Sequence, residues 1–139
     1  MNREEARECL ARKLAILEKI AANTATQGKF VGRREMRGLR RLLAERAALI
    51  DELAAVDERL AGDDTRRLLD ASFAAELRAI DAKHREVLAA CSQVITQACA
   101  ERGRIAAELT SSRQVRQAKN RYVDRWQVMA WGNRLNVKG

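Results

Sequence analysis

The sequence contains no proline and few aromatic residues: two phenylalanines, one tyrosine and two tryptophans among 139 residues. Its seven glycines are scattered and form no loop motif. Hydrophobic residues, largely Ala and Leu, make up 47% of the chain, and charged residues make up 33%. A chain without proline carries no obligatory helix breaker, and this composition is typical of long helices and coiled coils. We therefore expect an all-α protein and exclude a β fold.

The sequence also lacks long apolar runs. None approaches the roughly 20 residues that a membrane-spanning helix needs. The first ten residues, MNREEARECL, lack the basic start and the apolar centre of a signal peptide. The three cysteines include no C-x-x-C pair, which argues against a disulfide framework. We therefore expect a cytoplasmic protein that does not insert stably into a membrane.

Residues that commonly carry chemistry are almost absent. His84 is the only histidine and has no cysteine within one helical turn, so we interpret it as a packed core residue. The acidic pair Asp63 and Asp64 is explained by helix capping. No glycine loop could cradle a phosphate, and no nucleophile has a base at a suitable spacing. We expect no catalytic residue, no metal and no cofactor, and a protein that is not an enzyme.

Apolar residues recur in steps of four and three after Phe73, a heptad pattern that predicts one long helix over residues 65–115. A second pattern of leucines, interrupted only by Arg46, predicts a helix over residues 34–61 that ends before Gly62. Because so few residues separate the two helices, they should form an antiparallel hairpin. In the long helix, the positions expected to be buried are Leu77, Ile80, His84, Val87, Cys91 and Val94.

The first 22 residues predict another helix. Asn2 followed by Glu5 is typical of a capped N-terminus, and a shorter leucine stripe follows it. The next stretch, residues 23–33, is poor in helix formers, and we interpret it as a connector. The expected architecture is a single helical domain over residues 1–139, a three-helix bundle with one long C-terminal helix.

The remaining stretch, residues 116–139, is a basic tail that contains aromatic residues. From residue 113 onward the chain carries seven Lys or Arg and one acid, which accounts for most of its net charge of +8. An exposed aromatic stripe on a basic background is a candidate docking site. A second basic stretch, Lys29–Arg41, is interpreted as a solvated face without an assigned role. The candidate partner-binding residues are Val115, Tyr122, Trp126, Met129 and Trp131.

Three features resemble the FlgN/FliT-type chaperones of flagellar type III export: the stretch GLRRLLAERAALIDELAAVDERL (38–60), the long third helix, and AKNRYVDRW (118–126) followed by GNRLNVKG. The resemblance implies a chaperone that binds and masks the amphipathic terminal segment of a hook-associated or filament-cap protein and delivers it to the export apparatus. It also implies that the C-terminal region contacts the substrate. Of the candidate residues, it assigns a role only to Tyr122, in a segment that can engage a component of the export gate.

Two other functions remain open. The basic side chains of the tail could bind phosphates while its tryptophans stack on bases, as in a helical nucleic-acid-binding accessory protein; this is the alternative, and we rank it below the chaperone. A heptad pattern also fits a coiled-coil homodimer or larger homo-oligomer, because the pattern alone does not say which chain supplies the partner helix. In the nucleic-acid alternative, the side chains that could bind phosphates are those of Arg113, Arg116, Lys119, Arg121 and Arg125.

Overall fold

The computed structural model describes the backbone of residues 1–138 and the side chains of residues 1–129. This part of the chain is all-α and contains no strand, which confirms the predicted fold class. The chain divides into two compact units, Met1–Cys99 and Ala100–Gly139, where the sequence led us to expect one domain. The elements are α1 (Arg3–Gly32), α2 (Met36–Leu60), α3 (Asp63–Leu68), the 3₁₀ helix η1 (Ala71–Phe73) and α4 (Ala74–Lys138).

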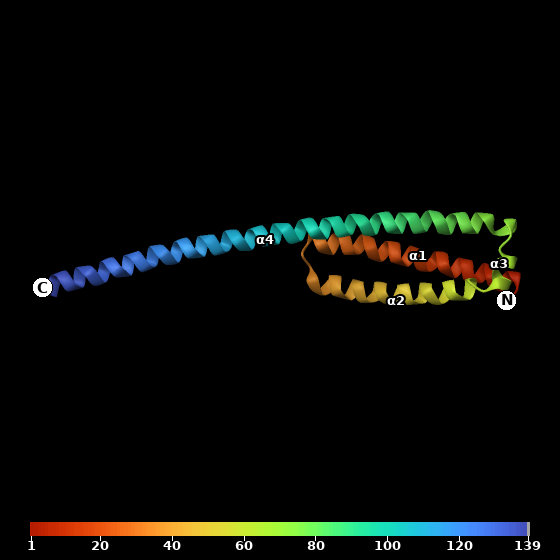
Figure 1. Cartoon of the computed structure of the whole chain (residues 1–139), viewed down its shortest axis with the longest axis horizontal. Helices are drawn as coiled ribbons and strands as arrows, with labels where there is room; N and C mark the ends of the chain where they lie inside the picture. The colour runs from red at the N-terminus through yellow and green to blue at the C-terminus, as the bar shows by residue number, and fades with distance from the viewer. Residues whose placement is uncertain (139) are drawn as a thin grey trace. The chain divides into compact units, whose positions relative to one another are not determined.

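In the first unit, α1, α2 and the beginning of α4 form a three-helix bundle (Figure 1). α2 runs antiparallel to α1, and α4 then runs in the same direction as α1. α1 is the central helix because it contributes three side chains to each of the two buried clusters of the core. The first cluster contains Cys9, Ile16, Ile20, Val56, Val87 and Cys91, and the second contains Ala6, Leu10, Leu17, Phe73 and Ile80.

Both ends of α1 are closed by hydrogen bonds. At its start, the side chain of Asn2 accepts a hydrogen bond from the N–H of Glu5 at 2.8 Å, and the Glu5 carboxylate accepts one from the N–H of Asn2 at 3.2 Å. This is the capping box that the sequence predicts. At its end, Arg34 has a left-handed φ of 56°, and the N–H of Glu35 reaches the carbonyl of Phe30 at 2.9 Å. The arrangement is a Schellman motif built without the usual glycine.

The connector predicted over residues 23–33 is wrong, because α1 continues as a helix through Gly32. Three of the polar residues that suggested a connector lie inside the bundle instead of on its surface. Polar groups are tolerated in a core when they are hydrogen-bonded, so the segment forms a polar layer of the bundle. The buried polar residues of this layer are Asn23, Thr24 and Gln27.

The helix predicted over residues 65–115 is interrupted near its start. α3 ends at Leu68 and α4 begins at Ala74, with η1 between them. The ring of Phe73 in η1 is fully buried, and the guanidinium groups of Arg3 and Arg7 each lie 5.6 Å from its centroid. Burial of this ring against α1 fixes the turn from which α4 starts. At the other end, α4 continues through the stretch predicted as a tail.

His84 is exposed, so its assignment as a packed core residue is wrong. The other five predicted positions on this face of α4 are buried or half-buried. Lys83 and Ala90, which were not predicted, are half-buried as well. At 3.6 residues per turn, His84 lies at the edge of the face formed by Ile80, Lys83, Val87 and Ala90, and its exposure shows that the bundle does not cover this edge of α4 at His84.

Candidate docking surface on α4

The second unit carries the candidate partner-binding residues on α4. Their side chains are highly exposed: 65% for Val115, 71% for Tyr122, 64% for Trp126 and 67% for Met129. Large apolar side chains with this much exposure are candidates for contact with another molecule. Trp131, the fifth candidate, lies outside the residues whose side chains the structure describes. We call the first four residues the α4 stripe.

The α4 stripe is compact around the helix axis. At 3.6 residues per turn, its four members fall within an arc of about 60°. At 1.5 Å per residue, the stripe extends about 21 Å along the helix, from Val115 to Met129. An apolar arc of 100° or more is typical of a helix packed on a globular core, and a narrower stripe is typical of the contact between two helices. The geometry therefore fits one helix laid along α4.

Cations border the α4 stripe on both sides. Lys119 lies about 50° from the centre of the stripe on one side, and Arg125 lies about 70° from it on the other. The only acid between residues 113 and 129, Asp124, lies about 170° away, on the opposite face of the helix. In the sequence these cations belong to a basic tail, and the continuation of α4 through them places them as the two borders of the stripe.

Other exposed apolar residues of α4 do not belong to the stripe. Val128 is 71% exposed but points roughly 130° away from the centre of the stripe. Ile105 and Leu109 are also exposed and lie nearer the start of the second unit. Val128 thus offers a matched control, because it has similar exposure and lies in the same helix.

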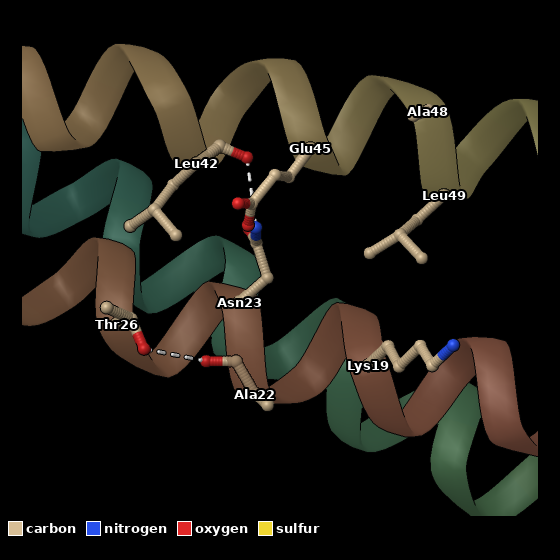
Figure 2. A pocket seen from close by; sticks show the side chains of 8 residues that line it. All are labelled: Lys19, Ala22, Asn23, Thr26, Leu42, Glu45, Ala48 and Leu49. Carbon is tan, nitrogen blue, oxygen red and sulfur yellow. Dashed lines mark hydrogen bonds between the residues drawn. The ribbon is translucent and has the colours of Figure 1, made fainter.

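The first unit contains a groove between α1 and α2 with a volume of about 480 Å³ (Figure 2). Leu42 and Leu49 of α2 extend toward α1 on one side of it, and Asn23 of α1 reaches the carbonyl of Leu42. The remaining lining side chains are mostly small or aliphatic. The groove is lined by Lys19, Ala22, Asn23, Thr26, Leu42, Glu45, Ala48 and Leu49. The hydrogen bond from Asn23 to the Leu42 carbonyl joins α1 to α2 across the groove, and the Thr26 hydroxyl donates to the Ala22 carbonyl within α1.

The described residues contain no group of three or more His, Cys, Asp or Glu side chains that could hold a metal ion. No helix in the same part of the chain is both long and apolar enough to cross a membrane. The α4 stripe, with exposed apolar side chains and a cation on each side, is the candidate docking surface in the described part of the chain. Comparisons of the chain with protein-family models, curated proteins and solved structures gave no match.

Proposed function

We propose that this protein is a cytoplasmic export chaperone that binds and masks the amphipathic terminal segment of a flagellar hook-associated or filament-cap protein. The observation that carries the proposal is the α4 stripe, four exposed apolar side chains on one face of a long helix. An exposed apolar face of this kind favours aggregation unless a partner covers it, and it is therefore typical of an interaction site. The resemblance of residues 38–60 and 118–126 to FlgN/FliT-type chaperones supports the identity of that partner.

The proposed mechanism is binding without a covalent step. A disordered segment with amphipathic helical character would aggregate or assemble early when it is free. When the segment lays its apolar face on the α4 stripe, both apolar surfaces leave water together. Tyr122 and Trp126 supply most of the contact because aromatic rings bring a large area with little conformational entropy to lose. The segment that carries Tyr122 would engage the export gate when the substrate does not cover it, as the resemblance implies.

The bundle of the first unit has a supporting role in this proposal. Its core consists of two apolar clusters and a hydrogen-bonded polar layer. This core gives α4 a folded beginning from which the helix can continue. Stability and partner binding should therefore separate, with the first unit setting the melting temperature and the α4 stripe setting the affinity.

The test is recovery of the partner from the native cell. Tagged wild-type protein should retain a flagellar export substrate, and deletion of that substrate's terminal segment should abolish retention. Trp126→Glu should lose the partner, whereas Val128→Glu, on the other face of the helix, should retain it. Recovery of nucleic acid whose binding falls steeply with salt would support the accessory-protein alternative and contradict the chaperone.

A further inference from the structure

We infer that the segment docking on the α4 stripe is an acidic amphipathic helix, with Asp or Glu on both edges of its apolar face. This inference rests on the proposed function and specifies the chemistry of its partner. It follows from the charges that surround the stripe and from the width of the stripe.

The charges beside the α4 stripe have one sign. Lys119 and Arg125 border it on opposite sides, and Arg116 lies next to Lys119, one turn earlier along the helix. Asp124 is too far around the helix to neutralise either border. A docked helix would therefore meet a cation on each edge of the apolar contact.

Docking removes part of the water around these cations. An opposite charge on the partner compensates a cation at the edge of the interface for the lost water. A like charge there makes the free energy of binding less favourable. A partner with carboxylates on both edges of its apolar face satisfies both borders. A partner with lysines there is rejected, so the borders select among amphipathic helices of equal apolar area.

The dimensions of the α4 stripe define the length of the partner. Four apolar positions over about 21 Å match a helix of about four turns. Its apolar residues would recur in steps of three and four, as those of the stripe do, because two helices in lengthwise contact share that spacing. The occupant is thus a single short helix.

A second copy of this chain is a poor occupant of the same surface. In its residues 113–129 the copy would bring five cations and only Asp124 as an acid. Cationic borders would then face cationic borders. An anionic lipid surface would satisfy the cations, but interfacial helices present a broad apolar face, and here Lys119 separates the stripe from Val123, the next exposed apolar residue around the helix.

The experiment uses three designed helical peptides of four turns with identical apolar positions and with Glu, Gln or Lys at the border positions. Affinities for the full chain are measured by isothermal titration calorimetry. The Glu peptide should bind at least about tenfold more tightly than the Lys peptide, with the Gln peptide between them. The double variant Lys119→Glu with Arg125→Glu should invert this order, because both changed positions are exposed and lie outside the core.

Equal affinities for the three peptides, or an unchanged order in the double variant, would overturn the inference. Vesicles of phosphatidylcholine with and without phosphatidylglycerol form a further arm. Binding to the anionic vesicles with no binding to the Glu peptide would assign the stripe to a lipid surface and also overturn it. If an export substrate is retained while the peptides are not ranked by charge, this inference fails alone. If the peptides are ranked but no export substrate is retained, the proposed function fails alone.

Discussion

The side-chain amide of Asn23 in α1 donates a hydrogen bond to the main-chain carbonyl of Leu42 in α2 at 2.9 Å. The same Asn23 accepts a hydrogen bond from the Gln27 amide at 2.7 Å, and both side chains are buried. A polar pair in the core is stable only while both members keep their partners. This layer therefore joins α1 to α2 at a defined register.

Replacement of Asn23 by alanine should lower the free energy of unfolding by about 1–3 kcal/mol, because Gln27 is left buried without its acceptor. The matched control is Thr26→Ala, since the Thr26 hydroxyl bonds only to the carbonyl of Ala22 in its own helix at 3.1 Å. Urea denaturation followed by circular dichroism measures both. If both variants lost the same free energy of unfolding, the hydrogen bond between Asn23 and the Leu42 carbonyl would not contribute to stability.

Val87→Asp should unfold the first unit. The Val87 side chain is 6% exposed in the core cluster shared by α1, α2 and α4, and a carboxylate there would lose its hydration without gaining a partner. Leu88→Asp is the control, because the neighbouring Leu88 is 58% exposed. Thermal melting should show a cooperative transition for Leu88→Asp and none for Val87→Asp. A native-like melt of Val87→Asp would mean that this face of α4 is not in the core.

The charge of Asp70 should make the stability of the folded state depend on pH. Hydrogen bonds from the Ser72 hydroxyl and N–H, with a smaller effect of the Arg3 charge, hold the pKa of Asp70 below its ordinary value of 3.8. A carboxylate with a lowered pKa in the folded state stabilises that state above the ordinary value, and the effect is lost as the pH falls through the lowered pKa.

Asp70→Asn should therefore unfold at a lower urea concentration than the wild type above pH 3.8, and the difference should disappear as the pH falls below this value and through the lowered pKa. The measurement is the urea midpoint as a function of pH. A difference that stays constant over the whole range would show that the charge of Asp70 plays no part. Ser72→Ala is a useful companion, because it removes the largest cause of the shift and should raise the pKa of Asp70.

Much of the fold could be predicted from the sequence because it depends on local rules. The capping box of Asn2 and Glu5 needs only two residues at a fixed spacing, and the leucine pattern of α2 needs only one helix face. The polar layer could not be predicted in this way. Asn23 and Gln27 resemble connector residues until the carbonyl of Leu42 is placed beside them, and that contact is between distant parts of the chain.

The same limit explains the other corrections. A heptad pattern placed His84 on a buried face, but the position of α1 and α2 around α4 decides where that face is centred. The sequence did not indicate a helix end at Arg34, because the residue with left-handed φ that follows a helix is usually glycine. For the candidate site, the spacing of apolar residues and, for Tyr122, the family resemblance predicted the stripe residues, and whether a partner binds them stays a prediction. The cationic borders at Lys119 and Arg125 follow from the angular positions of these residues on the continuous helix α4.

The α4 stripe is expected to bind a partner and to add nothing to the core of the first unit. The most direct measurement is the melting temperature and partner affinity of Trp126→Ala beside those of Val128→Ala, which loses a side chain of similar exposure from another face of α4. We predict that Trp126→Ala weakens binding of the retained export substrate by about 1–3 kcal/mol and leaves the melting temperature nearly unchanged. Val128→Ala should change neither quantity. A Trp126→Ala protein that melts at a markedly lower temperature and binds normally once folded would instead assign the stripe to the core.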